Sequence, residues 1–365
     1  MTVKSSISLS TDVTNIRKFP LSDPAKNGVS LDTLAQLQTN PSDREINPLK
    51  KGTCIKDKNP LIKRARRKYL TENIVLKLVD AGKANPNSDL GKSYWHTWHC
   101  ARVLHKLPNG KVSAHYCKQK WCTVCNSIRT AQLINDYRPH FEKWDDPWFV
   151  TVTRPNVTEQ ELPNELQVMK RTFTTIKESY NRQARRKKQP ILLGLRKTEC
   201  TYNVGRNTFH PHFHFLFNGK DAAFEFLYQW LERNPTASPY AQDIVKSSGD
   251  TLMEMFKYFT KLITTSPDGK RAIYADAMDI IFNAIKGHQV FRSFGFVKGK
   301  KVIEGERQIT AEDVMEIYTW ISELADWANP ETGELLSGYI PSQGMKSLVE
   351  DRILLRPRNI AKPIR

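Results

Sequence analysis

The alternation of apolar and polar residues predicts an antiparallel sheet in the middle of the chain. Residues 148–154 are rich in aromatic and β-branched residues and end before Pro155, as expected for a strand. Residues 191–202 predict a second strand and residues 209–217 a third. The link between them, 203–207, is rich in turn-forming residues, so these two strands should form an antiparallel hairpin.

Apolar residues at helical spacing predict the helices. A stripe at steps of four and three marks an amphipathic helix, which should pack on the sheet. Its members are Leu162, Leu166, Met169, Phe173, Ile176 and Tyr180. Similar patterns predict helices over residues 221–233, 251–265, 277–285 and 310–327.

The third strand carries histidines on one face. In a two-residue period, His210, His212 and His214 share one side, and the phenylalanines between and after them share the other. If the turn centres on residues 205–206, Glu199 lies opposite His212 and faces the same side, whereas a slip of one residue would turn it away. Two imidazoles and a carboxylate suit an open Mg²⁺ or Mn²⁺ site. The alternative is a packed, hydrogen-bonded histidine cluster.

The polar side of the 251–265 helix carries a second set of reactive groups. Glu254, Tyr258 and Lys261 fall on one side of a helical wheel, opposite the apolar residues. Tyr258 could act as a nucleophile, with the metal and Lys261 favouring its phenolate form. Glu254 could act as a general base on water or on a 3′-hydroxyl in a second transfer step. The alternative is a surface tyrosine hydrogen-bonded at the edge of the helix.

Four of the six cysteines are clustered in the sequence. Cys100, Cys117, Cys122 and Cys125 include one Cys-x-x-Cys turn, and together they can complete a closed tetrahedral zinc site. Four nearby histidines could each replace one thiolate, namely His96, His99, His105 and His115. A redox pair, disulfides and unliganded buried cysteines are the alternatives.

The charge of the chain indicates a polyanionic partner. Lys and Arg number 56 against 38 Asp and Glu, which gives a formal charge of +18. The densest basic cluster, Arg182, Arg185, Arg186, Lys187 and Lys188, is a candidate DNA-binding surface. A basic helix is also expected near residues 61–79, either as a solvated face or in contact with phosphates. No apolar run is long enough to cross a membrane, so a cytoplasmic protein is expected.

These patterns predict five regions. A flexible arm (1–60) precedes a basic helical segment and linker (61–92), a four-cysteine zinc module (93–135) and a catalytic domain (140–298). A helical extension with a basic tail (299–365) follows.

Three ordered motifs resemble those of rolling-circle plasmid replication initiators of the HUH endonuclease superfamily. They are the Thr-Val-Thr strand at 151–153, the His-Pro-His-Phe-His segment at 210–214, and residues 254–261 around Tyr258. The segment 117–125 is similar to a cysteine cluster upstream of these motifs in one branch, although Thr123 stands where a proline is usual. The resemblance covers about residues 98–298 and leaves the arm and tail uncovered.

The resemblance implies an α+β fold of the ferredoxin or RRM-like kind, in which a central antiparallel sheet has helices on one face and follows the zinc module. It also implies that His212 and His214 bind a divalent ion with Glu199 as third ligand, and leaves the role of His210 open. Tyr258 would attack a phosphodiester at the plasmid origin, forming a 5′-phosphotyrosyl bond and a free 3′-hydroxyl. Glu254 would help to terminate replication.

Origin DNA, single-stranded at the nick, would be the substrate, and a host helicase and DNA polymerase would be partners. A transposase or relaxase shares the same chemistry. A non-catalytic zinc protein that represses by binding DNA is the alternative from another class.

Overall fold

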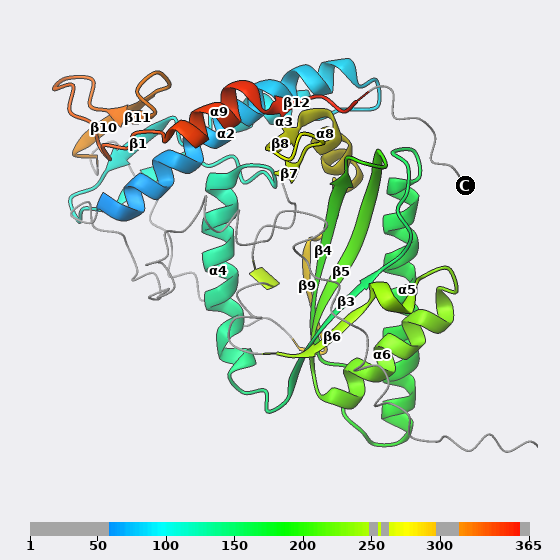
Figure 1. Cartoon of the computed structure of the whole chain (residues 1–365). Coiled ribbons are helices and arrows are strands. Elements are labelled where there is room, and N and C mark those ends of the chain that lie inside the picture. Colours follow the sequence, from blue (N-terminus) through cyan, green and yellow to red (C-terminus); the bar gives the residue numbers. More distant parts are fainter. Residues whose placement is uncertain (1–57, 248–254, 257–262, 297–313, 358–365) are drawn as a thin grey trace, which may run out of the picture.

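The computed structural model describes residues 58–247, 255–256, 263–296 and 314–357 (Figure 1). The arm predicted for residues 1–60 lies outside these ranges except for its last three residues, and Glu254, Tyr258 and Lys261 lie outside them altogether. The described part combines helices with largely antiparallel sheets, which confirms the α+β class.

A five-stranded sheet forms the centre of the region predicted as the catalytic domain. Its order is β6 (Asp243–Lys246), β3 (Pro147–Thr153), β5 (Thr208–Asn218), β4 (Gly194–Asn203) and β9 (Phe291–Phe294), and all neighbouring strands are antiparallel. A short 3-10 helix, η4 (Pro239–Ala241), leads into β6. In the β4–β5 hairpin Glu199 pairs with His212, so the predicted register is confirmed.

Helices cover both faces of this sheet. One face packs on α5 (Leu162–Arg186) and α6 (Lys220–Arg233), through a core that includes Phe213, Phe215 and Phe226. The opposite face meets α4 (Thr123–Phe141), as Figure 1 shows. The prediction of helices on one face only is therefore wrong.

The second helical layer has a local cause. On the histidine face, the strands end in apolar residues, Phe149, Leu195 and Leu216, which would be exposed without a cover. Tyr137 and Phe141 of α4 pack there and remove them from water. The histidines occupy the other end of the same face, beyond this apolar patch.

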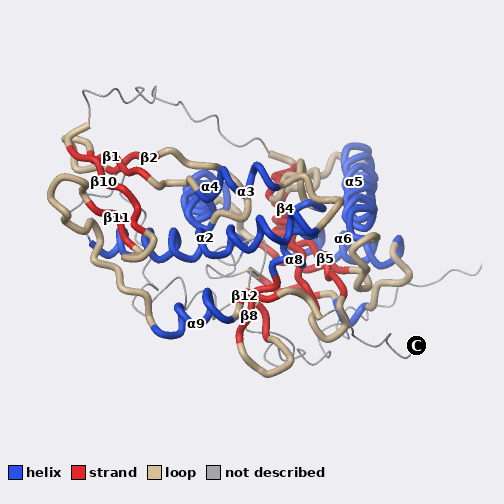
Figure 2. Tube along the Cα trace, turned by 90° about the horizontal axis from the view of Figure 1, so that it is seen from above, coloured by secondary structure: helices blue, strands red, loops and turns tan. Residues whose placement is uncertain are grey.

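The long helix α2 (Lys58–Ala84) joins two further cores and crosses the molecule in Figure 2. Near its start Leu61 and Ala65 pack with the cysteines, and further on Val75 and Leu78 pack against α8 (Ala275–Ala284). The basic helix expected at 61–79 is present within it, but it is not simply a solvated face. Lys68, for example, is fully buried and donates to the carbonyl oxygen of Trp98 at 2.7 Å.

Smaller elements complete the second core. They are α3 (Gly91–Trp98), α9 (Gln343–Asp351) and a sheet of β12 (Ile353–Leu354), β8 (Arg271–Tyr274) and β7 (Thr264–Thr265), in which β12 and β8 run parallel. Thr264 and Thr265, predicted as the end of the 251–265 helix, instead form strand β7 and pair with β8.

A four-stranded sheet lies beside the cysteines. Its order is β11 (Asp326–Ala328), β10 (Glu316–Ile321), β1 (Val103–Lys106) and β2 (Val112–Ala114). The helix predicted for 310–327 is wrong over its described part, since Tyr318 and Trp320 are buried while Ile317 before them is exposed, which fits a strand period. Strands from opposite ends of the chain thus build one sheet.

Candidate metal centres

The β4–β5 hairpin brings three potential metal ligands together on the histidine face. Glu199 Oε2 lies 2.9 Å from His212 Nε2 and 2.9 Å from His214 Nε2. Glu199 is buried, and the two imidazoles are 12% and 16% exposed. One oxygen and two nitrogens therefore converge at a point that solvent can still reach, as an open metal site requires.

Neighbouring groups orient both imidazoles with Nε2 toward this point. His212 Nδ1 lies 3.1 Å from the carbonyl oxygen of His210, and His214 Nδ1 lies 2.9 Å from Thr151 Oγ1. A carbonyl oxygen only accepts, so a hydrogen bond here requires the proton on Nδ1 of His212, which makes Nε2 the nitrogen that would bind a cation in place of its contact with Glu199. The donor set and the groups that orient it both fit a divalent ion.

His210 does not join the three ligands. Its Nδ1 lies 2.7 Å from Asn156 Oδ1, and its Nε2 lies 3.1 Å from Thr153 Oγ1. The group whose ligand atoms lie within 4.8 Å of one another consists of Glu199, His212 and His214. In this structure His210 orients His212 through its backbone carbonyl.

Lys197 is a further member of the site that sequence reasoning missed. It lies two residues before Glu199 on the same strand face, it is almost fully buried, and its Nζ is 2.6 Å from Glu199 Oε1. One carboxylate oxygen thus contacts the lysine while the other faces the histidines. The sequence did contain one indication of this role, because residues two apart on a strand share a face and Lys197 therefore lies beside Glu199.

The electrostatics of the site depend on this pair. Burial opposes ionisation of Glu199, but Lys197 and then His214 outweigh it and hold the pKa of the carboxyl well below its usual range. Burial lowers the pKa of His214 to about 4, although Glu199 acts in the opposite direction. Around neutral pH the site therefore presents a carboxylate and a neutral His214, which are the forms that bind metal.

The four clustered cysteines form a second, enclosed group. Cys100 Sγ lies 3.4 Å from Cys125 Sγ and 3.6 Å from Cys122 Sγ, and Cys117 Sγ lies 3.6 Å from Cys125 Sγ. A disulfide would need about 2.05 Å, whereas a tetrahedron with Zn–S bonds of about 2.3 Å has edges of roughly 3.8 Å. The observed separations match the tetrahedron.

Backbone N–H groups support these sulfurs. The amide of Cys117 donates to Cys100 Sγ at 3.4 Å, that of Gln119 to Cys117 Sγ at 3.5 Å and that of Cys125 to Cys122 Sγ at 3.4 Å. Such donors stabilise thiolates, and all four cysteines are buried. The donor set fits a structural zinc ion.

The nearby histidines are engaged elsewhere. His96 Nε2 lies 3.1 Å from His115 Nε2 on the surface, and His105 lies in strand β1. His99 follows α3 and stacks edge-on against Trp98. Among the described residues, the cluster contains only the four cysteines, as first predicted.

The predicted reactive residues of the 251–265 helix lie outside the described ranges, but two neighbours are placed. Met255 and Phe256 are buried on the histidine face, against Leu195 and Leu216. The carbonyl oxygen of Phe256 accepts from Thr130 Oγ1 of α4 at 3.0 Å. In the sequence, Tyr258 follows Phe256 by two residues.

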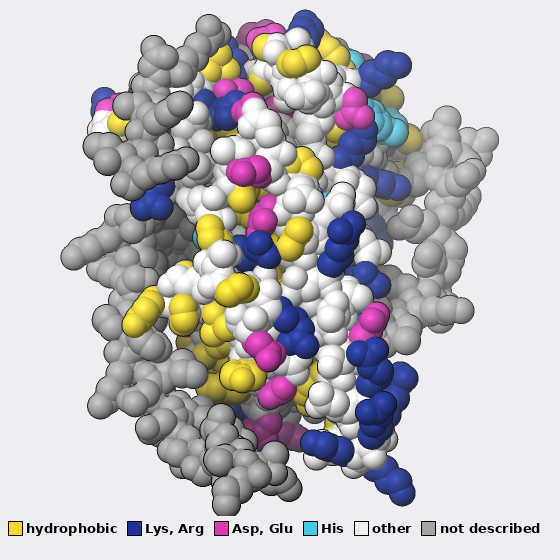
Figure 3. All heavy atoms as spheres, turned by 90° about the vertical axis from the view of Figure 1, so that its right-hand side faces the viewer, with side chains coloured by type: hydrophobic (Ala, Val, Ile, Leu, Met, Phe, Trp, Pro, Cys, Tyr) yellow, Lys and Arg dark blue, Asp and Glu magenta, His cyan; other side chains and the backbone are white. Residues whose placement is uncertain are grey.

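The basic cluster at the end of α5 is exposed but far from the histidines along the sheet. It lies on the helix that covers the opposite face. The start of α5 adjoins the end of β3 through the Arg154–Glu165 ion pair, whereas Leu192, just after the cluster, bonds to Asn181 near the other end of the sheet. Figure 3 shows Lys and Arg gathered along one edge of this side of the molecule.

Fold and site together define an α+β protein with one enclosed sulfur site and one open His/His/Glu site, in a strongly basic chain. A family model described as a replication protein matches residues 110–331, more than half of the chain. The chain therefore belongs to this replication protein family, which confirms the resemblance to plasmid Rep proteins.

Two curated relatives are similar to it, and both are called Protein rep. The one from Staphylococcus aureus is 29% identical over 168 residues, which are 40% of this chain and 70% of the relative. The one from Streptococcus pneumoniae serotype 2 is 32% identical over 120 residues, 30% of this chain and 35% of the relative. No solved structure matches the chain significantly. None of the described helices is both long and apolar enough to span a membrane.

Proposed function

We propose that this protein initiates rolling-circle replication of a plasmid by nicking one strand of the origin, with Tyr258 as the nucleophile. The observation that carries the proposal is the convergence of His212, His214 and Glu199 on one open face of the sheet. Membership of the replication protein family supports DNA as the substrate of that site.

The groups divide the chemistry between them. When bound, a Mg²⁺ or Mn²⁺ ion would polarise a phosphoryl oxygen and offset the charge that develops on it. The Tyr258 oxygen would form a bond to phosphorus while the bond to the 3′ oxygen breaks, and that oxygen would leave as a 3′-hydroxyl after taking up a proton. Lys261, together with the metal, would favour the phenolate form of Tyr258, whose proton would pass to solvent, and Glu254 would act as a general base on water or on a 3′-hydroxyl in a second transfer step.

The placement of Met255 and Phe256 supports Tyr258 as the nucleophile. Both residues pack against the face that carries the histidines, and Leu216 of β5 lies two positions beyond His214. The chain between Phe256 and Tyr258 spans at most about 7 Å. The position of these two neighbours supports the proposal that Tyr258 acts at the metal-binding side of the sheet.

The four-cysteine group would hold zinc and serve the fold rather than the reaction. Its ligands are buried and it has no open coordination position, unlike a catalytic zinc site. It would keep the segment 100–125 packed on α2 and on the β1–β10 sheet.

The test is capture of the covalent intermediate. Purified protein is incubated with supercoiled plasmid and single-stranded origin DNA in Mn²⁺, and adducts that survive SDS are digested and analysed by mass spectrometry. We expect a nucleotide on the Tyr258 peptide, none in Tyr258→Phe, and normal adduct in Tyr228→Phe, which changes a surface tyrosine on α6. A nick without a protein-linked 5′ end would overturn the covalent mechanism, and specific DNA binding without any nick would favour a repressor.

A further inference from the structure

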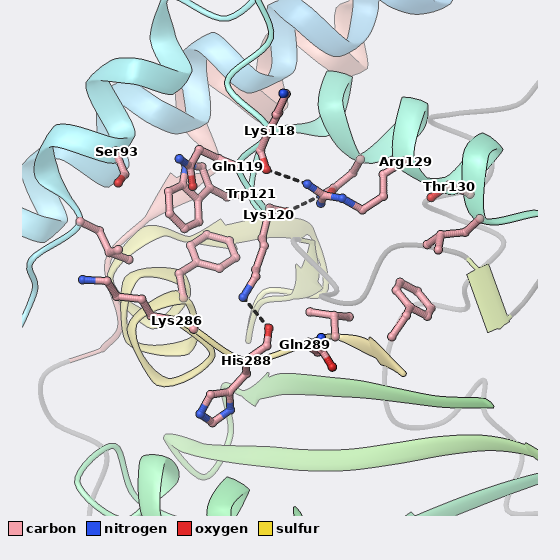
Figure 4. Close-up of a pocket in the computed structure, with 17 residues that line it drawn as sticks. Ser93, Lys118, Gln119, Lys120, Trp121, Arg129, Thr130, Lys286, His288 and Gln289 are labelled. Carbon is pink, nitrogen blue, oxygen red and sulfur yellow. Dashed lines mark hydrogen bonds between the residues drawn. The ribbon is translucent and has the colours of Figure 1, made fainter. Parts of the chain in front are cut away.

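A pocket of about 430 Å³ lies between the cysteine loop and the catalytic sheet (Figure 4). Residues 118–121 of the loop and α4 form one side, and the segment 286–291 between α8 and β9 forms the other. It is distinct from the His/His/Glu site, and it is large enough for a small organic ligand.

Two cations in this pocket are held by neutral groups. Lys120 Nζ donates to the carbonyl oxygens of Ile285 at 2.8 Å and His288 at 2.7 Å. Arg129 donates to Asn126 Oδ1 at 2.9 Å and to the carbonyl oxygen of Lys118 at 2.6 Å. None of the described lining residues is acidic. The positive charges of Lys120 and Arg129 are therefore not neutralised by these contacts, and their remaining N–H groups can donate to a bound anion.

The other two lysines of the lining contribute less. Lys286 is paired with Asp89 at the rim. The side chain of Lys118 points away from the cavity, and only its carbonyl oxygen faces Arg129 (Figure 4).

Further positive charge lies close behind the pocket. Burial, together with Arg196, Lys120 and Arg292, lowers the pKa of Lys170 to about 8. Burial and the nearby Lys170, Lys120 and Arg196 likewise lower the pKa of His288 to about 4. Like charges held this close repel one another, and a bound anion would relieve that repulsion.

The rest of the lining suits a flat heterocycle. The partly buried ring of Phe291 supplies aromatic surface, whereas Trp121 and Phe282 are buried and pack on each other with ring centroids 5.3 Å apart. The amides of Gln119 and Gln289 can donate to and accept from the edge of a base. Cations beside aromatic walls and amides are the groups that bind an unstacked nucleotide.

The pocket also adjoins the metal-binding strands. Phe291 lies opposite Lys197 in the β4–β9 pair, and the amide of Thr198 donates to the carbonyl oxygen of Val290 at 2.9 Å. On the other side, Thr130 lines the pocket and bonds to the backbone of Phe256. A strand of DNA at the His/His/Glu site would thus pass close to this opening.

We propose that the pocket binds one unstacked nucleotide of the DNA strand beside the nick site, with its phosphate at Lys120 and Arg129 and its base against Phe291 and the glutamine amides. This inference rests on the proposed function in one respect, that DNA is the substrate of the neighbouring site. None of the three metal ligands is among the described residues that line the pocket.

Binding of a fluorescent 16-nucleotide oligothymidylate tests the proposal. Arg129→Gln removes the charge but keeps a donor for the Lys118 carbonyl, and Gln289→Trp fills the cavity from an exposed position without changing charge. We expect each variant to bind about tenfold more weakly, as for loss of one charge-assisted contact or one stacked base. The log–log salt slope should fall by about 0.7 for Arg129→Gln and stay constant for Gln289→Trp.

The control is Lys92→Gln, which makes the same charge change on an exposed residue of α3 outside the pocket. Its affinity should stay within about twofold of the original protein, as expected for one screened surface charge. Unchanged binding by both pocket variants would overturn the proposal. Thymidine monophosphate that binds as tightly as the oligonucleotide, and is lost in the same variants, would instead identify a site for free nucleotides and overturn it as well.

Adduct formation separates this inference from the proposed function. If the unmodified protein forms the Tyr258 adduct while its DNA affinity is the same in Arg129→Gln and Gln289→Trp, the pocket proposal fails and the nicking mechanism stands. If the unmodified protein forms no adduct while its DNA affinity still depends on Arg129 and Gln289, the nicking mechanism fails and the pocket stands.

Discussion

The two candidate metal centres differ in how their ligands are distributed through the fold. The four cysteines come from the end of α3, a loop and the start of α4, and they are enclosed by the core formed with α2 and β10. The three ligands of the other site come from a single hairpin, whose strands pair over ten residues and whose opposite face is packed by phenylalanines. The first centre links separate elements of the fold, whereas the ligands of the second all lie on one hairpin whose strands are held by their own hydrogen bonds and packing.

This difference explains why the sites should respond differently to loss of the ion. A cluster that joins separate segments contributes binding free energy to folding. A site on a finished sheet, open to solvent on one side, can exchange its ion and bind substrate without unfolding. The predictions below test this contrast.

Removing zinc should have the largest effect. Apparent binding free energies of structural zinc are about 10–16 kcal/mol, so a strong chelator, or Cys122→Ser, should unfold the segment around the cysteines. Trp320 and Trp327 are buried in the same core, and their fluorescence should shift to the red. Cys200→Ser is the matched control, because Cys200 is a buried cysteine in β4, outside the cluster. Unchanged tryptophan emission after complete loss of zinc would contradict the structural role.

Removing Lys197 should weaken the fold in a way that metal can correct. Lys197→Met leaves the buried Glu199 carboxylate without its ion pair, which typically costs about 3–5 kcal/mol of unfolding free energy. Saturating Mn²⁺ should restore part of this loss, because the ion supplies a replacement charge to the carboxylate. Urea unfolding with and without Mn²⁺ measures both effects, and Lys197→Arg should stay near the original stability. Equal destabilisation with and without the ion would show that Lys197 acts by packing alone.

The β4–β5 hairpin could be predicted from the sequence because the residues that define it lie close together in the chain. The two-residue period of 209–217 and the turn residues at 203–207 define both the face and the register, and the structure has Glu199 opposite His212 as expected. The stripe from Leu162 to Ile176 is likewise buried along α5. The cysteine spacing indicated a four-sulfur site for the same reason, since the Cys-x-x-Cys turn is local.

What could not be predicted depends on contacts between distant segments. Strand β10 pairs with β1 across more than 200 residues, and its short alternation around Trp320 was read as a helix. The packing of α4 on the histidine face could not be predicted, because Leu195 and Leu216 belong to strands while Tyr137 belongs to a helix far from both in sequence. Lys197 looked like an ordinary strand lysine, and only its burial beside Glu199 gives it a role.

Removing one ligand from the open site should abolish metal binding while preserving the fold. We expect His212→Ala to lower Mn²⁺ affinity by at least about 100-fold, more than the usual loss of a supporting group. The free energy of unfolding should change by no more than about 1 kcal/mol, since the imidazole is on the accessible face. His210→Ala is the control, because His210 lies outside the ligand group and should affect binding much less. Titration of free Mn²⁺ by electron paramagnetic resonance measures the affinity of both variants. An equal loss of Mn²⁺ affinity in His212→Ala and His210→Ala would identify His210 as a ligand.

The smallest effect should come from the group that orients His214. Thr151 Oγ1 lies 2.9 Å from His214 Nδ1, and Thr151→Val removes the oxygen with little change in shape. Groups that hydrogen-bond to metal-bound histidines typically contribute 10–100-fold, and because His214 is also packed against Phe149, we expect a loss of about tenfold in Mn²⁺ affinity. Thr151→Ser, which keeps the hydroxyl, should restore it. If the Thr151→Val variant binds Mn²⁺ as tightly as the original protein, packing against Phe149 alone orients the His214 ring. The ligands of the open centre would then be held by packing, as those of the enclosed centre are.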